Sequence, residues 1–312
     1  MPGLTRVEGP ALILVAPEPL AGKTTLAAGL AQRLAAGGHT VALLRLAGDE
    51  HAAADAATFA ALPFNASGSG QPLEPGALGE ATAATQIAVI EAPSGDATDI
   101  IKAAPTARAV VVAGAGSAAA DVAAYCRGLG PALAGVIVNR VPARRAEAVK
   151  AALAAAGLTP LAMVAEDRLL AAPTLAQIAE AIQARAQFLN ASGERLVARP
   201  VIASISADPG QGYFTQQDPS AVIVRGDKPD LQLAALNAGA PCLLLTGGDP
   251  PLSYVLDRVE EDEVPLLQTG LDTVTTVQRI EGLFAAAPFG GEEKLRRIAE
   301  LLDVLDATAL LK

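Results

Sequence analysis

The chain contains no tryptophan, and aromatic residues make up only 3% of its 312 residues. A hydrophobic core must therefore consist of aliphatic side chains and alanine, for which 51% hydrophobic residues supply ample material. The two cysteines, Cys126 and Cys242, are far apart in sequence, which speaks against a disulfide framework and favours small apolar roles in a reducing compartment. Because His39 and His51 are the only histidines, no Cys/His spacing resembles zinc ligation.

Positive charge is also scarce, since 23 Lys and Arg face 33 Asp and Glu and the formal net charge is −10. Nucleic acids and anionic membranes attract basic surfaces, so we expect neither as a partner. The first apolar run, residues 11–15, is too short to cross a bilayer, and charged residues follow it closely. We therefore expect a cytoplasmic protein.

Short apolar runs alternate with alanine-rich stretches of helical length. The runs in the first half are residues 11–15, 41–46, 87–90, 109–113, 135–138 and 161–164. Those in the second half are residues 201–205, 221–224, 242–245 and 265–267. Strands joined by helix-length connections predict parallel sheets covered by helices.

The predicted fold class is therefore α/β, with a three-layer parallel-sheet domain followed by a smaller α/β domain. We place the first domain at residues 1–190 and the second at residues 198–312, because the helical pattern breaks between about 186 and 200. A charged amphipathic helix near residues 292–303 is expected to pack on the second domain or to dimerise.

Residues 16–25 read Ala-Pro-Glu-Pro-Leu-Ala-Gly-Lys-Thr-Thr and lie between a predicted strand and a predicted helix. In a phosphate-binding loop the backbone N–H groups and the helix N-terminus surround the phosphates. Lys23 would neutralise the outer phosphates and the Thr24 hydroxyl would ligate Mg²⁺. Pro17, which has no N–H, stands where the usual pattern has glycine, and an ordinary strand-to-helix turn is the alternative.

Polar residues follow the predicted strands at the edge where ligands of parallel sheets bind. Glu91 lies where many P-loop proteins hold a carboxylate that orients Mg²⁺ or its water. Asp55 would add a second carboxylate, although solvated surface acids are the alternative for both positions. The run Gly-Ala-Gly-Ser-Ala-Ala at 114–119 resembles a dinucleotide fingerprint but lacks the acidic residue about 20 positions on, so we favour the P-loop.

From Leu12 to about Arg185 the chain resembles the dethiobiotin synthetase-like P-loop domain, which also forms the N-terminal part of some bacterial phosphotransacetylases. Residues that match the loop of that family are Glu18, Gly22, Lys23 and Thr24, with Thr25 following. The resemblance implies ATP and Mg²⁺ as cofactors. The loop pattern and the carboxylates after the strands predict catalytic roles for Lys23 and Glu91, and a metal site at Thr24, Glu91 and Asp55.

Two strand ends extend this resemblance. Arg45 falls where relatives carry a lysine, which implies a phosphate or substrate contact. Asn139 lies in the run Gly-Val-Ile-Val-Asn-Arg-Val-Pro and falls where the family reads the adenine edge. Residues 166–168, Glu-Asp-Arg, match the last three residues of a further family run.

The second half resembles the DRTGG domain, which is named for its Asp-Arg and Thr-Gly-Gly motifs. The residues that carry the resemblance are Gly226, Asp227, Asp230, Thr246, Gly247, Gly248, Asp272 and Thr273, with Lys228 in place of the arginine. The first six are the predicted ligand residues, because their turns follow strands and would hold a small anion or nucleotide by backbone N–H groups. The alternative is that the glycines only make tight turns.

The order of the two resemblances is that of the phosphotransacetylase N-terminal region, but the acyl-transfer domain is absent, so transacetylase activity is not expected. We expect an ATP-binding protein that hydrolyses ATP slowly or uses it to activate a small metabolite, with a second domain that senses a metabolite. The alternatives are a non-catalytic nucleotide sensor and a regulatory or structural partner of a metabolic enzyme. The expected partners are a nucleotide and an unidentified small metabolite, and a homodimer remains open.

Overall fold

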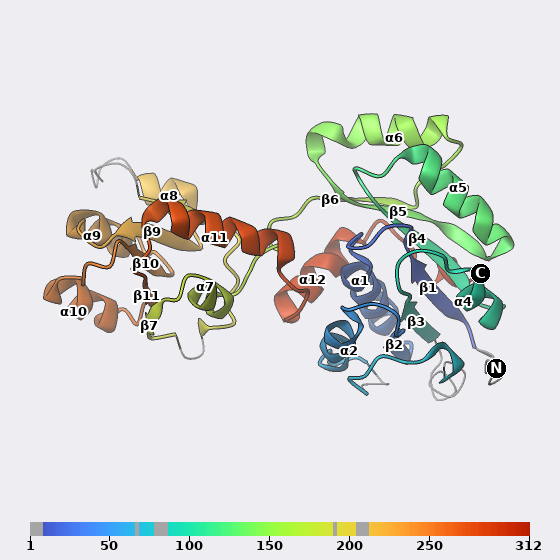
Figure 1. Cartoon of the computed structure of the whole chain (residues 1–312), viewed down its shortest axis with the longest axis horizontal. Helices are drawn as coiled ribbons and strands as arrows, with labels where there is room; N and C mark the ends of the chain where they lie inside the picture. Colours follow the sequence, from blue (N-terminus) through green and yellow to red (C-terminus); the bar gives the residue numbers. More distant parts are fainter. Residues whose placement is uncertain (1–8, 66–68, 78–86, 190–191, 204–211) are drawn as a thin grey trace. The chain divides into compact units, whose positions relative to one another are not determined.

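The structure, a computed structural model, describes residues 9–65, 69–77, 87–189, 192–203 and 212–312. The chain divides into two units (Figure 1). Unit 1 comprises Met1–Asp167 and Phe289–Lys312, and unit 2 comprises Arg168–Pro288. Unit 2 is therefore inserted into the sequence of unit 1. Both units combine a sheet with helices, which confirms the predicted two-domain α/β class.

Unit 1 is built on a six-stranded sheet in the order β2-β3-β1-β4-β5-β6. The strands are β1 (Ala11–Val15), β2 (Val41–Arg45), β3 (Ile87–Glu91), β4 (Arg108–Gly114), β5 (Leu133–Val141) and β6 (Ala162–Ala165). Every neighbouring pair is parallel. All residues of β1, β2 and β3 are buried, as continuous apolar runs predict for strands covered on both faces.

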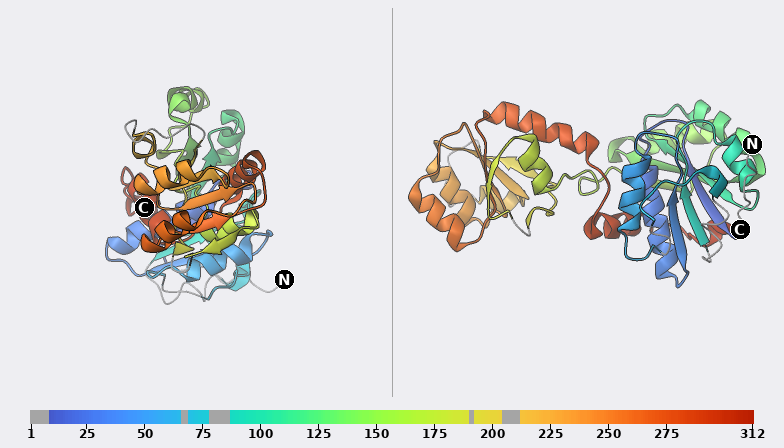
Figure 2. Two further views of the ribbon diagram at one scale, coloured as in Figure 1. Left: turned by 90° about the vertical axis from the view of Figure 1, so that its left-hand side faces the viewer. Right: turned by 60° about the horizontal axis from the view of Figure 1, so that its bottom comes forward.

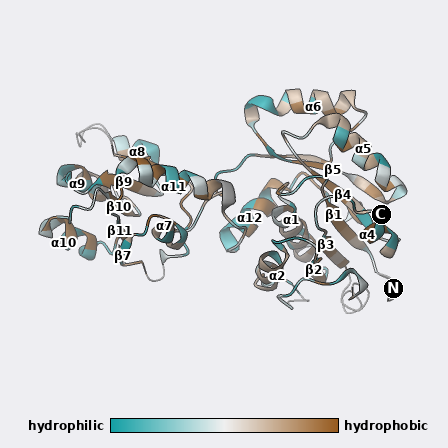
Figure 3. Cartoon of the chain, viewed as in Figure 1, coloured by the Kyte–Doolittle hydropathy of each residue, from teal (hydrophilic) through white to brown (hydrophobic). Residues whose placement is uncertain are grey.

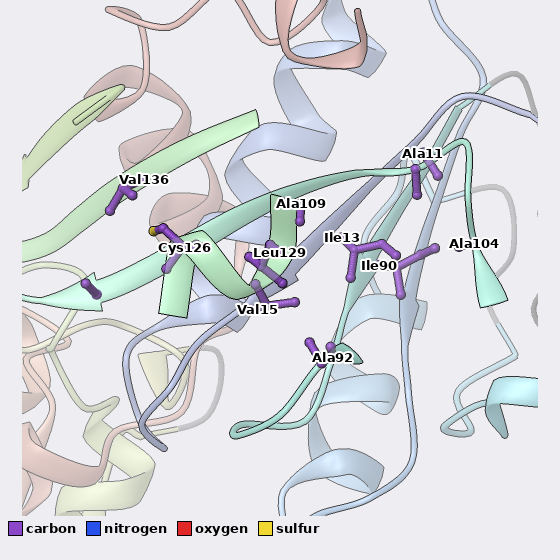
Figure 4. Close-up of a cluster of buried hydrophobic side chains, with 14 of the residues drawn as sticks. Ala11, Ile13, Val15, Ile90, Ala92, Ala104, Ala109, Cys126, Leu129 and Val136 are labelled. Carbon is purple, nitrogen blue, oxygen red and sulfur yellow. The ribbon is translucent and has the colours of Figure 1, made fainter. Parts of the chain in front are cut away.

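Helices cover both faces of this sheet. They are α1 (Lys23–Ala36), α2 (Ala52–Ala60), α4 (Thr98–Ala103), α5 (Ala119–Leu129), α6 (Ala146–Ala155) and α12 (Glu292–Leu301). On one face, Ile13 and Val15 of β1 and Ile90 of β3 share a buried cluster with Cys126 and Leu129 of α5 (Figure 4). The Cys126 thiol is free, and the core is aliphatic as the scarcity of aromatic residues predicts.

The C-terminal helix α12 lies against α1, on the opposite face of the sheet (Figure 1). Ile298 and Leu302 are completely buried there. A Cβ atom on Gly29 of α1 would come within 2.8 Å of both side chains, so glycine permits the close approach of the helices. Arg33 of α1 also pairs with Asp303. The predicted placement of this helix with the second domain is therefore corrected: its apolar face completes unit 1.

Unit 2 has a five-stranded sheet in the order β7-β11-β10-β9-β8. Its strands are β7 (Arg185–Gln187), β8 (Pro200–Ile202), β9 (Ala221–Arg225), β10 (Leu243–Thr246) and β11 (Leu266–Gln268). Its helices are α7 (Leu175–Ala181), α8 (Tyr213–Gln217), α9 (Pro229–Asn237), α10 (Ser253–Glu261) and α11 (Thr273–Ala286). Helices lie on both sides of the strands (Figure 2). Cys242 is fully buried.

The sequence did not predict β7, because Arg-Ala-Gln is not an apolar run. Among the described residues, β7 pairs with β11, to which it is antiparallel. The predicted boundary near 186–200 therefore falls inside unit 2, and the chain passes from unit 1 to unit 2 after Asp167. The strands are coloured mainly as hydrophobic, and hydrophilic residues occur mostly on helices and loops (Figure 3). Within the described residues, no helix has the length and apolar character needed to cross a bilayer.

Candidate functional site

The turn between β1 and α1 presents a group of backbone donors. Gly22 has a φ of 89°, in the left-handed region that glycine adopts without strain, and α1 begins at the next residue. The N–H groups of Ala21, Gly22, Lys23, Thr24 and Thr25 have no acceptor in the part of the chain that the structure describes. A helix N-terminus with unpaired donors carries partial positive charge and favours an anion.

Two side chains from the start of α1 contact groups at and just after the end of β3. Lys23 is 5% exposed, and its Nζ donates a hydrogen bond of 2.7 Å to Ser94 Oγ. Thr24 Oγ1 donates a hydrogen bond of 3.1 Å to Glu91 Oε1. Burial lowers the pKa of the Lys23 ammonium, and the Glu91 carboxylate partly opposes that shift. The structure thus brings Lys23, Thr24 and Glu91 together.

Glu91 is a buried carboxyl group with one unsatisfied oxygen. The residue is 3% exposed, and Oε2 has no hydrogen-bond partner among the described residues. The closest cationic group to that oxygen is Arg45 Nε, at 3.7 Å. Burial raises the pKa of Glu91 to about 7, against the opposing effect of Arg45. A buried, unsatisfied carboxylate oxygen favours the binding of a cation or of a proton.

Arg45 ends β2 and is almost fully buried. Its Nη2 donates to both carboxylate oxygens of Asp49, at 2.6 and 2.5 Å, and its Nε donates to Asp55 Oδ2 at 3.3 Å. The guanidinium is therefore already paired, and the phosphate or substrate contact expected for Arg45 would compete with these two carboxylates. The Asp55 carboxylate, in turn, is engaged by the Arg45 guanidinium.

The side chains of Asn139 and Arg140, at the end of β5, donate hydrogen bonds to backbone carbonyls of the turn between β1 and α1. Asn139 Nδ2 donates to Ala21 O at 3.0 Å, and its Oδ1 accepts from Arg140 N at 2.9 Å. The Arg140 guanidinium donates to Leu20 O. A Cβ atom on Gly22 would lie 2.1 Å from Asn139 Nδ2. Both polar atoms of the Asn139 amide are thus engaged with backbone groups, and the predicted contact with an adenine edge would use the second N–H of Nδ2 or the second lone pair of Oδ1.

Sequence reasoning missed two serines beside this loop. Ser117, which follows β4, donates a hydrogen bond of 3.1 Å to Glu18 Oε2, on the exposed part of the loop. Ser94 follows Glu91 by three residues and accepts from Lys23. The signal available for both was their position just beyond a strand end. Of the family run at 166–168, Asp167 pairs with Arg297 of α12, with 2.8 Å between Oδ2 and Nε.

In unit 2 the glycine turns follow β9 and β10, as predicted, but their N–H groups are engaged. Gly226 N donates to Thr246 O at 2.8 Å. Gly247 N donates to Leu271 O at 2.8 Å, and Gly248 N donates to Thr269 O at 3.1 Å. These bonds favour the tight-turn interpretation of the three glycines. An anion held by these N–H groups would have to displace a backbone carbonyl.

The side chains at this edge are more open. Asp227 is paired with Arg225 through two hydrogen bonds of 2.9 and 2.7 Å on the surface. Asp230 is exposed in the first turn of α9. Thr246 is buried, and its hydroxyl lies 2.8 Å from that of Thr273 at the start of α11. A ligand at this edge would therefore meet the two exposed carboxylates, whereas the Thr246 hydroxyl is buried beside that of Thr273.

Comparison with known proteins identifies unit 2. Residues 177–283 match the DRTGG domain, so the chain contains such a domain, as predicted. The chain is also similar to the crystal structure of the CBS and DRTGG domains of the regulatory region of Clostridium perfringens pyrophosphatase, complexed with the activator diadenosine tetraphosphate. The identity is 20% over 36% of this chain and 48% of that chain, with a TM-score of 0.30. The match thus spans about half of that solved chain.

Proposed function

We propose that unit 1 binds ATP with Mg²⁺ at the turn between β1 and α1. The observation that carries the proposal is the convergence of three features: the unpaired N–H groups of residues 21–25, the buried Lys23 ammonium, and the contact between Thr24 and Glu91. Together they provide an electropositive cradle for phosphates beside two oxygen ligands for a hard cation. The dethiobiotin synthetase-like resemblance supports the same assignment.

The residues present fit Mg²⁺. This ion is usually bound through one or two carboxylates, with waters and substrate phosphates completing the coordination. Thr24 and Glu91 would hold it, and the unsatisfied Glu91 Oε2 is the atom that a cation would compensate. Asp55, the third predicted ligand, is bound to Arg45. Within the described residues no group of three or more His, Cys, Asp or Glu side chains could hold a metal ion, so phosphate oxygens would have to contribute.

The reaction we propose is phosphoryl transfer, either to water or to a small carboxylate or amine. Bound Mg²⁺ would neutralise charge on the phosphates. Lys23 would stabilise the charge that develops on the transferred phosphoryl group. Turnover should be slow, because Pro17 and Pro19 supply no N–H donors to the loop. The same prolines support the alternative function, a nucleotide sensor without turnover.

Thermal unfolding tests nucleotide binding. ATP with Mg²⁺ should raise the melting temperature of the wild type, since a ligand at 100 times its Kd adds about 2.7 kcal/mol of stability. Lys23→Ala should abolish the shift, whereas Lys102→Ala, which changes an exposed lysine on α4, should keep it. A wild type that shows no shift at millimolar ATP would favour a structural partner of a metabolic enzyme.

Adenine should be preferred to guanine. Guanine-reading P-loop proteins use Asn-Lys-x-Asp, and here Asn139 and Arg140 are followed by Pro142 at the position of that aspartate. GTP should therefore displace a fluorescent ATP analogue less effectively than ATP does. Equal displacement by the two nucleotides would contradict the preference.

Steady-state kinetics separate an enzyme from a sensor. We expect ATP turnover well below the roughly 1–100 s⁻¹ that is typical of kinases, and we expect Glu91→Gln to abolish it. Binding without measurable turnover in the wild type would support the sensor. Fast hydrolysis that persists in Glu91→Gln would exclude both the role of Glu91 and the sensor.

For unit 2 we propose metabolite sensing through the side chains of Asp227, Asp230 and Thr246, since the N–H groups of Gly226, Gly247 and Gly248 are engaged. The test is calorimetry on the full chain with Lys23→Ala, so that binding in unit 1 does not contribute. AMP, ADP and inorganic phosphate are the first probes, and Asp227→Asn should alter any binding detected. No binding by any probe would favour a regulatory partner whose second domain contacts a protein.

We also propose a cytoplasmic homodimer, to be tested by cell fractionation and light scattering. Because the apolar face of α12 is buried against α1, a dimer would have to use another surface. A monomeric mass at micromolar concentration would contradict the dimer.

A further inference from the structure

Ser94 lies in the segment after β3 and contacts the buried Lys23. The segment 92–95 crosses the carboxyl edge of the sheet beside β1. Ser94 Oγ accepts the 2.7 Å hydrogen bond from Lys23 Nζ. Neither the sequence resemblance nor the similarity to known proteins assigns a role to this serine.

The segment around Ser94 is fixed on several sides. Ala92 N donates to Leu14 O at 3.0 Å, and Gly95 N donates to Ala16 O at 2.9 Å. The Tyr125 hydroxyl of α5 donates to Gly95 O at 2.7 Å. These bonds tie both ends of the segment to the base of the loop and to a helix. The Ser94 hydroxyl is thereby held in place before any ligand arrives.

Among the described residues, the hydroxyl hydrogen of Ser94 has no acceptor. A serine hydroxyl can donate one hydrogen bond and accept two. In the part of the chain that the structure describes, Ser94 Oγ accepts from Lys23 and donates to no acceptor. Lys23 itself is almost completely buried, with no second acceptor for its ammonium among the described residues. A phosphate oxygen bound to the Lys23 ammonium would therefore lie within reach of the Ser94 O–H.

We propose that Ser94 is a phosphate-contacting residue that recognises the outermost phosphate. Its hydroxyl holds the ammonium of Lys23 in the absence of nucleotide and donates to an oxygen of the terminal phosphate of ATP when nucleotide is bound. The loop surrounds the inner phosphates from the α1 side, whereas Ser94 approaches Lys23 from β3. Ser94 thus favours ATP over ADP. This inference rests on the proposed binding of nucleotide at the same loop.

The test is calorimetry of the full chain with ATP·Mg²⁺ and with ADP·Mg²⁺. Hydrogen bonds to charged groups are among the stronger ones, so Ser94→Ala should weaken ATP binding by about tenfold and ADP binding by less than about twofold. Ser94→Thr, which keeps a hydroxyl, should retain the preference for ATP. Ser253→Ala, the same chemical change at an exposed position of unit 2, should leave both affinities unchanged.

The outcomes separate this inference from the function on which it rests. Wild type that binds neither nucleotide would overturn both. Wild type that binds ATP, together with Ser94→Ala that weakens ATP and ADP equally, or neither, would overturn the role of Ser94 alone. The melting temperature of Ser94→Ala without nucleotide should match that of the wild type, because the ratio of the two affinities reports a phosphate contact only if the fold is intact.

Discussion

Both units place glycine-containing turns at the carboxyl edges of their sheets. The turns differ in whether their backbone N–H groups already have an acceptor among the described residues. In unit 1 the N–H groups after Gly22 have no acceptor among the described residues, and a buried lysine and glutamate lie beside them. In unit 2 the N–H groups of Gly247 and Gly248 are bound to carbonyls. The charged pair nearest to them, Arg225 and Asp227, is exposed.

The difference shows that glycine-rich turns after strands do not by themselves leave backbone N–H groups free for an anion. What matters is whether the N–H groups of the turn are already hydrogen-bonded to a carbonyl of the protein. In unit 1 the turn leads into a long helix whose first donors stay unpaired. In unit 2 a neighbouring turn, residues 269–271, supplies the acceptors instead. The two edges should therefore respond differently to substitution.

The largest difference between the units should follow from removing residues 289–312. This truncation takes away the buried side chains of the C-terminal segment, among them Leu295, Ile298 and Leu302. At about 1.5–3 kcal/mol for each buried aliphatic side chain, unit 1 would lose on the order of 5–9 kcal/mol from these three alone, which is comparable to the whole stability of many domains.

Unit 2 loses no residue of its own in the same truncation. Amide NMR spectra should therefore lose the dispersed signals of unit 1 and keep those of residues 168–288. Ile298→Ala is the milder variant and should cost about 2–4 kcal/mol in unit 1 alone. Parallel loss of both sets of signals would show that the units do not fold separately.

Two arginines at strand ends provide the next comparison. Arg45→Ala leaves Asp49, Asp55 and the buried Glu91 without their cation and should cost about 3–5 kcal/mol of unfolding free energy. Arg225→Ala removes an exposed pair and should cost less than about 1 kcal/mol. Urea unfolding of the two variants measures the difference. Equal costs would contradict the contrast between a buried and an open edge.

Glu91 should make the stability of unit 1 depend on pH. Its pKa in the folded protein is raised from 4.5 to about 7 by burial, so between these values the folded state binds more protons than the unfolded state. Stability should therefore fall as pH rises from about 4.5 to about 7, by on the order of 3 kcal/mol at about 1.4 kcal/mol per pKa unit. Above pH 7 this contribution stays lost.

Glu91→Gln isolates the contribution of this one group, since the other titrating groups remain. Urea unfolding of both proteins in EDTA at a series of pH values should show the wild type losing stability relative to the variant across that window. A constant difference between the two would mean that Glu91 does not titrate there.

The smallest difference between the units should come from one glycine in each turn. Gly22 and Gly247 have φ values of 89° and 91°, so alanine costs about 1–2 kcal/mol at either position. At Gly22 the new Cβ would also collide with Asn139 Nδ2, whereas at Gly247 nothing lies within 4 Å. Gly22→Ala should thus be the less stable variant and should lose the ATP-dependent thermal shift, which Gly247→Ala keeps.

The sequence predicted the strands of both sheets except β7, because the sequence of a buried parallel strand is a continuous apolar run. It also predicted Lys23, Thr24 and Glu91 as parts of one site, and the fold brings these three side chains together. It did not predict that Arg45 is paired with Asp49, that Asn139 holds the loop, or that α12 returns to unit 1. Each of these depends on tertiary contacts between residues whose local sequence is compatible with several partners.

The return of α12 to unit 1 also sets the order in which the protein can be completed during synthesis. The ribosome makes residues 1–167 first, but the helix that covers α1 emerges only after all of residues 168–288. The DRTGG domain therefore has all of its residues before unit 1 does, although translation of unit 1 begins earlier. Until α12 has been synthesised, the face of α1 around Gly29 is uncovered in the nascent chain. A chaperone would bind this exposed face.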